Sequence, residues 1–515
     1  MFTRRLLALL SIFAFHIALP TNSAFPQDRA TVTSRWNTVI RESKTSVSMS
    51  VCVEPPMRRG SPIHDQLFGA VQNLEADFLH FQPWNPYPRI AVAELEPPHD
   101  GKSSWDFSLI DPILIDFMKA AAGRPVIMNM STIPEWMWKT DKPVSYPADP
   151  DEITWTYEQG TELRDPTMKE VADYWARVAS WYTKGGFSDE YGKWHESGYH
   201  YKFAYWEVLN EVDIEHTMTP QFYTALYDAI VTEVRKVAPD MKFMGMALTP
   251  NGPLTQPNWF EYFLNSKNHR PGIPVDAFSY HFYSQGCPAP DAGPEVTPYC
   301  MFTQADGLVN VVRYIDSIRS RLSPQTFTMI DEVGTIIPDS QAPQLVRPLP
   351  HSYWNVSGAM FAYLYPQLVH LGIDVVHESE LIDYPGQFAG TTLVDWETGR
   401  PNARYWALKL IHENFASGDK LVETRVVTVD AKNPDSEPGR DYLYGQAFVS
   451  REKKRKILLV NKRDRSFEIG IPDGAGAQVE YVDQTTAFEP PAKTTLKSDR
   501  LTLNSFGVAV VTLPN

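Results

Sequence analysis

Strand-like and helix-like segments alternate along most of this chain, and this alternation constrains the fold more than any other feature of the sequence. Eight short runs rich in β-branched and other apolar residues lie at 47–53, 77–82, 125–130, 203–209, 241–248, 276–283, 326–333 and 373–378. Segments with helical spacing separate them, such as the apolar stripe of residues 222, 226, 230 and 234. Such alternation is typical of α/β proteins with parallel strands, and eight repeats favour a (β/α)8 TIM barrel.

An open, doubly wound sheet is the alternative to a closed barrel, because its strands and helices alternate in the same way. Sheets of that kind that bind dinucleotides carry a glycine-rich loop after the first strand. No such loop follows residues 47–53. The sequence therefore favours the barrel.

The character of the sequence changes near Ser417. Helical periodicity ends there, and short alternating strands, separated by turn clusters such as Pro472-Asp473-Gly474, continue to the end of the chain. This change predicts a barrel over residues 45–416 and a β-sandwich domain over residues 417–515. Residues 25–44 form an N-terminal extension that either adds a strand to the sandwich or wraps the barrel.

The first residues predict a secretory signal peptide over residues 1–24. Arg4 and Arg5 precede an apolar run from Leu6 to Leu19, and small residues follow at positions 23 and 24. The run of about 14 residues is short for a membrane span, and an uncleaved anchor is the alternative. No other segment is long and apolar enough to span a membrane. We therefore expect a secreted protein, extracellular or periplasmic, with no membrane span in its mature chain.

The three cysteines and the charge balance limit the possible partners. Cys287 and Cys300 flank a proline-rich stretch and are expected to form a disulfide in an oxidising compartment. Cys52 lies in an apolar run and is expected to be a buried free thiol. No Cys-x-x-Cys or His-x-His pair is present, so we expect neither a metal nor a cofactor. The net charge of −15 argues against nucleic acid as a partner, and the oligomeric state does not follow from the sequence.

Two predicted strands end in carboxylates. The fourth ends in Trp-Glu-Val-Leu-Asn-Glu at 206–211, and the seventh in Ile-Asp-Glu-Val-Gly at 330–334. Active sites of (β/α)8 barrels lie at the carboxyl ends of the strands, so these acids should face each other across the barrel mouth. Retaining glycoside hydrolysis uses two carboxyl groups about 5–5.5 Å apart. One attacks the anomeric carbon, and the other protonates the leaving oxygen and later activates water.

Three segments resemble motifs of glycoside hydrolase family 39 of clan A, a family that includes β-xylosidases and α-L-iduronidases. They are 206–211, already quoted, Trp-Asp-Phe-Ser-Leu-Ile-Asp at 105–111 and Ile-Pro-Glu-Trp-Met at 133–137. The resemblance covers most of residues 45–415. It implies a (β/α)8 barrel beside a β-sandwich, and β-xylosidase-like action on plant or microbial carbohydrate without a cofactor. The sugar, the linkage and exo or endo action do not follow from it.

The resemblance also implies roles for individual residues. Glu211 corresponds to the general acid/base, Glu332 to the nucleophile, and Asn210 to an asparagine that hydrogen-bonds the sugar 2-hydroxyl. His281 and Tyr283 alternate along the sixth strand and therefore share a face. In the clan, residues at this strand end contact the two carboxylates, and a tyrosine hydroxyl often keeps the nucleophile ionised.

Two tryptophans are candidates for binding sugar rings. Trp84 follows the second strand and Trp136 follows the third. The faces of their rings can stack on the C–H groups of a sugar. Simple packing is the alternative for both residues.

Three positions depart from the clan pattern or need a different interpretation. No arginine lies at the end of the second strand, where Gln82 or the later Arg89 could substitute. Asp331 is expected to point away from Glu332, because successive side chains of a strand alternate. Glu207 lies deeper on the fourth strand than its terminal acid, which predicts a buried ion pair.

These residues predict a secreted, retaining glycoside hydrolase that acts on carbohydrate by double displacement. The mechanism needs an ionised Glu332 and a protonated Glu211, and the nearby negative charge should raise the pKa of Glu211. The alternative is a non-catalytic carbohydrate-binding or cell-surface protein on a degenerate barrel. The presence of both glutamates argues against that alternative.

Overall fold

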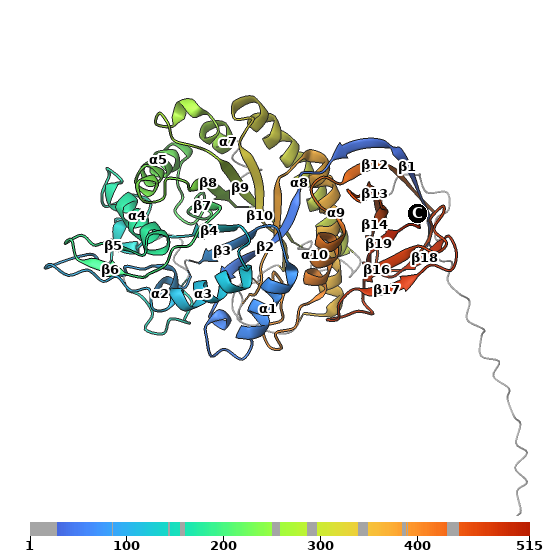
Figure 1. Cartoon of the computed structure of the whole chain (residues 1–515), viewed down its shortest axis with the longest axis horizontal. Coiled ribbons are helices and arrows are strands. Elements are labelled where there is room, and N and C mark those ends of the chain that lie inside the picture. Colours follow the sequence, from blue (N-terminus) through green and yellow to red (C-terminus); the bar gives the residue numbers. More distant parts are fainter. Residues whose placement is uncertain are drawn as a thin grey trace, which may run out of the picture.

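The eight predicted strands form one closed barrel in the computed structural model (Figure 1). In barrel order they are β10 (Phe327–Ile336), β11 (Val375–Glu378), β2 (Ser46–Val53), β3 (Leu79–Pro83), β4 (Val126–Met130), β7 (Tyr205–Val208), β8 (Lys242–Leu248) and β9 (Ala277–Gln285). All eight neighbouring pairs are parallel. The predicted α/β fold class, a (β/α)8 barrel with a C-terminal β-domain, is confirmed.

The structure describes most but not all of the chain. The described residues are 28–84, 86–142, 145–154, 160–249, 258–285, 296–337, 349–383, 388, 390–429 and 442–514. The predicted signal peptide at 1–24 lies outside them, and so does Cys287 of the predicted disulfide. Cys52 is a buried free thiol, as predicted. No helix in these ranges has the length and apolar character of a membrane span.

Helices surround the barrel and pack apolar side chains against it. The longer ones are α1 (His64–Leu74), α3 (Ile110–Ala121), α4 (Lys169–Thr183), α5 (Pro220–Val237), α7 (Asn258–Phe263), α8 (Val296–Leu322), α9 (His351–Leu371) and α10 (Ala403–Asn414). In α5, the Thr219 side chain accepts a hydrogen bond from the Phe222 N–H, and Pro220 occupies the first turn. Of the predicted stripe of this helix, Leu226, Ile230 and Val234 are fully buried and Phe222 is partly buried.

Short elements connect these layers. They are α2 (Pro88–Ala91), the 3-10 turns η1 (Pro55–Met57), η2 (Glu135–Met137) and η3 (Ser266–Asn268), and the hairpin of β5 (Gly186–Ser188) and β6 (Trp194–Glu196). Three of them follow barrel strands: η1 follows β2, α2 follows β3 and η2 follows β4. They therefore belong to the rim at the carboxyl ends of the strands.

The second domain is a nine-stranded sheet. Its order is β17 (Ala492–Thr495), β16 (Gln478–Val482), β19 (Val508–Thr512), β14 (Arg455–Asn461), β13 (Leu443–Val449), β12 (Lys420–Val429), β1 (Asp28–Glu42), β15 (Phe467–Gly470) and β18 (Arg500–Leu503). Val479 and Ile469 come from opposite ends of this order but belong to one apolar core, so the sheet folds over itself. β1 pairs with β12 and β15, so the N-terminal extension supplies a strand to this domain.

Helices α9 and α10 join the two domains (Figure 1). The Tyr363 ring of α9 meets Tyr444 with centroids 5.0 Å apart, and the Lys462 ammonium lies 4.1 Å from the Tyr363 ring centre. The Trp406 indole of α10 donates to the Phe488 carbonyl over 2.9 Å. These contacts hold the β-domain against one side of the barrel.

One fully buried arginine of α10 supports the barrel mouth. Arg404 Nε lies 3.2 Å from Glu378 Oε1 at the end of β11, and its other nitrogens donate to the carbonyls of Ser379 and Thr391. Gly334 lies alongside; a side chain there would come within about 3.1 Å of Arg404 and of the Tyr283 ring. Burial raises the pKa of Glu378 to about 8, and Arg404 opposes that rise.

Replacing Arg404 with leucine should lower the free energy of unfolding by about 3–5 kcal/mol, because a buried carboxyl and two carbonyls lose their donor. Arg400→Leu is the matched control. Its ion pair with Glu489 is half or more exposed and should contribute less than about 1 kcal/mol. Urea unfolding of both variants measures the difference. Equal losses would show that the buried arginine is not a structural support.

Candidate active site

A cavity of about 660 Å³ lies at the carboxyl ends of the barrel strands. Six of the seven residues predicted to act on or bind substrate line it together: Trp84, Asn210, Glu211, His281, Tyr283 and Glu332. They come from the ends of β3, β7, β9 and β10. The barrel therefore gathers side chains that are far apart in the sequence into one concave site.

His281 lies between the two glutamates. Its Nδ1 is 2.9 Å from Glu211 Oε1 and 3.2 Å from Glu332 Oε2. One oxygen of Glu211 and one of Glu332 lie within 4.8 Å of each other. This close approach is compatible with the short carboxyl separation of retaining glycosidases.

The backbone that carries Glu211 is strained. Leu209 and Glu211 have φ angles of 64° and 39°, in the left-handed region that residues other than glycine rarely adopt. The Glu211 N–H donates to the Ala247 carbonyl over 2.9 Å, and the Asn210 N–H donates to the Ser131 carbonyl over 3.2 Å. These bonds anchor the turn after β7, so the strain is held where the acid enters the cavity.

The environment of Glu211 favours its protonated form. Burial raises the pKa of Glu211, and the nearby charge of Glu332 raises it further, whereas the contact with His281 works in the opposite direction. The net direction is upward. A carboxylic acid that remains protonated near neutral pH can donate a proton to a leaving group.

Tyr283 supports Glu332 from the other side. Its hydroxyl donates to Glu332 Oε2 over 2.7 Å and lies 2.6 Å from Ser379 Oγ. Burial raises the pKa of Tyr283 well above its ordinary value, and the charge of Glu332 adds to the rise. The hydroxyl therefore keeps its proton, and Ser379 is the donor in the second hydrogen bond.

Asn210 lines the cavity and has a side-chain oxygen without a partner in the described part of the chain. Its Nδ2 donates to Glu215 Oε1 over 3.0 Å, and its Oδ1 is buried with no hydrogen-bond partner among the described residues. Burial raises the pKa of Glu215 well above its ordinary value. The unpaired oxygen of Asn210 could accept a hydrogen bond from a sugar hydroxyl.

The two predicted tryptophans have different positions. Trp84 lines the cavity beside Phe388, with ring centroids 5.6 Å apart. Trp136 instead lines a second cavity of about 520 Å³. Its indole donates to the Glu94 carbonyl over 2.8 Å, and the Arg164 guanidinium covers its ring at 4.6 Å. The structure therefore does not bring Trp136 to the carboxylates, because packing already occupies its ring face.

The alternation expected for Asp331 and Glu332 is wrong. The pairing of β10 with β9 shifts between Ile330 and Glu332, which is the mark of a β-bulge. The bulge turns both acids towards His281: Glu332 lies near its Nδ1, and Asp331 Oδ2 is 3.6 Å from its Nε2. The predicted ion pair of Glu207 is present, with His80 Nε2 at 2.8 Å.

Three further cavity residues were not assigned to the site from the sequence. Gln82, one of the two candidates to replace the clan arginine, lines the cavity, and its buried Oε1 has no partner among the described residues. Arg89 lines the second cavity instead. Glu380 and the Cys52 thiol also line the cavity. Glu380 lies just beyond one predicted strand end and Cys52 at the end of another, and this position was a signal for both.

The donor types of Glu211, His281 and Glu332 are also those that bind metal ions. At 2.9 and 3.2 Å, however, the His281 nitrogen and the two carboxylate oxygens already lie at hydrogen-bond distance. The three residues therefore form a hydrogen-bonded group.

Comparison with known proteins gives a likeness of fold. No family model matches the sequence, and no curated protein matches it. Among solved structures, the GH51 arabinofuranosidase from Xanthomonas axonopodis pv. citri is similar with a TM-score of 0.64 at 11% identity, covering 95% of this chain and 100% of that one. A GH30 endoxylanase from Clostridium papyrosolvens C71 has a TM-score of 0.54 at 14% identity, covering 94% and 100%.

A third similar structure is CelM2, a bifunctional glucanase-xylanase from a metagenome library, with a TM-score of 0.56 at 13% identity and coverage of 95% and 99%. Together these likenesses show that the chain has the fold of clan A glycoside hydrolases. They show this fold alone and do not single out family 39.

Replacing Glu332 with glutamine should lower the pKa of Glu211, because one of the charges that raise it is removed. A pH titration of 13C-labelled glutamate side chains by NMR measures this pKa. Glu489→Gln is the control, since Glu489 is 70% exposed and lies outside the cavity. An unchanged pKa in Glu332→Gln would show that the two carboxyls do not interact.

Proposed function

We propose that this protein is a retaining glycoside hydrolase that cleaves oligo- or polysaccharide by double displacement. One observation carries the proposal: Glu211 and Glu332 approach within 4.8 Å at the floor of a cavity, with His281 between them. Such a close pair of carboxyl groups suits direct attack by one carboxylate on the sugar. The clan A fold supports the same reaction class.

In the proposed first step, Glu332 attacks the anomeric carbon while Glu211 protonates the departing oxygen. The glycosidic bond breaks and a covalent glycosyl ester of Glu332 forms. Glu211, now ionised, then takes a proton from water, and the resulting hydroxide equivalent releases the sugar from Glu332. The Tyr283 hydroxyl, 2.7 Å from Glu332 Oε2, stabilises the carboxylate before attack and after release.

For the substrate, we propose β-xylosidase-like action on a pentose-containing carbohydrate. The motifs similar to family 39 support this assignment, and two of the similar structures are a GH51 arabinofuranosidase and a GH30 endoxylanase. The sequence also supports secretion through the leader at residues 1–24 and a bridge between Cys287 and Cys300. These finer assignments form part of the proposal.

Glu332→Ala should abolish sugar release from a panel of aryl β-glycosides that includes the β-xyloside, because no covalent intermediate can form. Release of the aryl group is followed by absorbance, and proton NMR of the first product measures the anomeric configuration, which should be retained. Glu489→Ala, which removes an exposed carboxylate, should leave the rate unchanged. Undiminished activity in Glu332→Ala would contradict the nucleophile, and a wild type that only binds oligosaccharide would favour the carbohydrate-binding alternative.

Glu211→Ala should slow hydrolysis of substrates with poor leaving groups by about 10²–10⁴-fold, because proton transfer to the departing oxygen is lost. Substrates with good leaving groups need little protonation, so their first step should lose much less. Comparing kcat/KM over a series of aryl leaving groups measures the difference. Equal losses across the series would contradict a role as general acid.

A further inference from the structure

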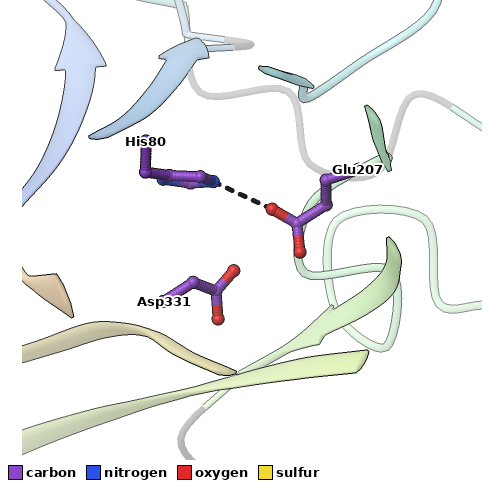
Figure 2. A group of neighbouring side chains, drawn as sticks. All are labelled: His80, Glu207 and Asp331. Carbon is purple, nitrogen blue, oxygen red and sulfur yellow. Dashed lines mark hydrogen bonds and ion pairs between the residues drawn. The ribbon is translucent and has the colours of Figure 1, made fainter. Parts of the chain in front are cut away.

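A second group of ionisable side chains lies inside the barrel beneath the candidate active site. Figure 2 shows His80 of β3, Glu207 of β7 and Asp331 of β10 facing one another, with a hydrogen bond between His80 and Glu207. All three side chains are fully buried. The proposed double displacement does not use any of them.

Glu207 is saturated with hydrogen-bond donors. His80 Nε2 at 2.8 Å, Asn129 Nδ2 at 3.0 Å and the Ser279 hydroxyl all contact its carboxylate. Burial works to raise the pKa of Glu207, but the contact with His80 and the other donors outweigh it and hold the pKa below its ordinary value. Glu207 is therefore a satisfied anion paired with His80 rather than an open ligand for a cation.

Asp331 is in a different situation. Neither of its oxygens has a hydrogen-bond partner among the described residues, and the same is true of His281 Nε2, which lies 3.6 Å from Asp331 Oδ2. Burial and the charge of Glu207 raise the pKa of Asp331 to about 7. Asp331 Oδ2 lies at ion-pair distance from His281 Nε2, so the charge of Asp331 stabilises a proton on that nitrogen.

His281 thus connects two groups of acids through its two ring nitrogens. Nδ1 faces Glu211 and Glu332, and Nε2 faces Asp331. Burial works to lower the pKa of His281, but the charges of Glu332 and Asp331 outweigh it and raise the pKa well above its ordinary value. A histidine with a raised pKa carries a proton on both ring nitrogens up to a higher pH, and its Nδ1–H then faces the two glutamates.

We propose that Asp331 is a positioning residue, which fixes the protonation of His281 so that Nδ1–H points at Glu211 and Glu332. The effect on catalysis rests on the proposed glycosidase function, whereas the protonation of His281 does not. Without Asp331, a neutral imidazole can move its proton to Nε2 and present a bare Nδ1 to the two acids. The ionised form of Glu332 would lose a donor, and Glu211 would lose the contact that holds its pKa down.

Several other ionisable groups surround the Asp331–His281 contact and contribute to the pH dependence of activity. Those facing His281 are Glu211 and Glu215 after β7, and Asp331 and Glu332 on β10. Those facing Asp331 are, besides His281, Glu207 of β7 and His80 of β3. His377 of β11 stacks on His80, and its pKa is held well below the ordinary value by burial and by the charge of His80. His377 therefore stays neutral and adds no charge.

Asp331→Asn tests the proposal through the pH dependence of activity. Both limbs of the kcat/KM profile should move to higher pH, and kcat at pH 7 should fall by about tenfold or more. Ile330→Val is the matched control: Ile330 is the neighbouring buried residue of β10 and faces the outer core. It should lower stability and leave both limbs in place. Unmoved limbs in folded Asp331→Asn would overturn the proposal.

The protonation of His281 can also be measured directly, without relying on enzyme activity. In 15N-histidine-labelled wild type at pH 7, the His281 signal, assigned by its loss in His281→Gln, should show a protonated Nδ1. In Asp331→Asn, or in Asp331→Ser if the first variant does not fold, the loss of that proton should shift to lower pH. A bare Nδ1 in the wild type would overturn the proposal. An inactive wild type with a protonated Nδ1 would contradict the proposed function only.

Discussion

The repulsion between two buried carboxylates is the constraint on which the candidate site depends. Glu211 and Glu332 come within 4.8 Å where they line one cavity, so charging both is costly without a donor nearby. His281 supplies that donor, and Tyr283 supplies a second to Glu332 alone. The two acids therefore differ in the stability of their charged forms, because only Glu332 accepts a hydrogen bond from the Tyr283 hydroxyl. Burial without such a donor moves Glu211 towards the protonated form.

The scaffold maintains this asymmetry with local distortions rather than with regular structure. Positive φ angles at Leu209 and Glu211 direct the acid into the cavity, and the bulge in β10 turns two consecutive acids towards one histidine. Regular strands would have placed Asp331 and Glu332 on opposite faces. Distortions of this kind persist because surrounding hydrogen bonds hold them, such as the bond from the Glu211 N–H to the Ala247 carbonyl.

The sequence was sufficient to predict the barrel and most of the grouping around the cavity. The periodicity of strands and helices reflects which residues are buried, so it can be read from a single sequence. Acids at the carboxyl ends of parallel strands lie at the same rim of the barrel, so their proximity could be predicted as well. The bulge at Asp331 could not be predicted, because it depends on register against β9. The position of Trp136 at the second cavity, with Arg164 over its ring, is set by tertiary packing that the sequence does not give. The sequence left open whether Gln82 or Arg89 replaces the clan arginine. Gln82 lines the main cavity and Arg89 lines the second one, and this difference depends on loop positions that the sequence does not give.

The pairing of β1 has a consequence for how the molecule is made. Residues from the beginning of the described chain form the sheet with residues near its end, as in the pair Glu42 and Lys420. The entire barrel is encoded between these partners, so the sheet of the second domain cannot close until nearly all of the chain has been synthesised. Contacts of such sequence separation are slow to form, and until β12 emerges the edge of β1 has no partner in this sheet. The molecule therefore cannot mature strictly from one end to the other: its first strand and its last domain become native together.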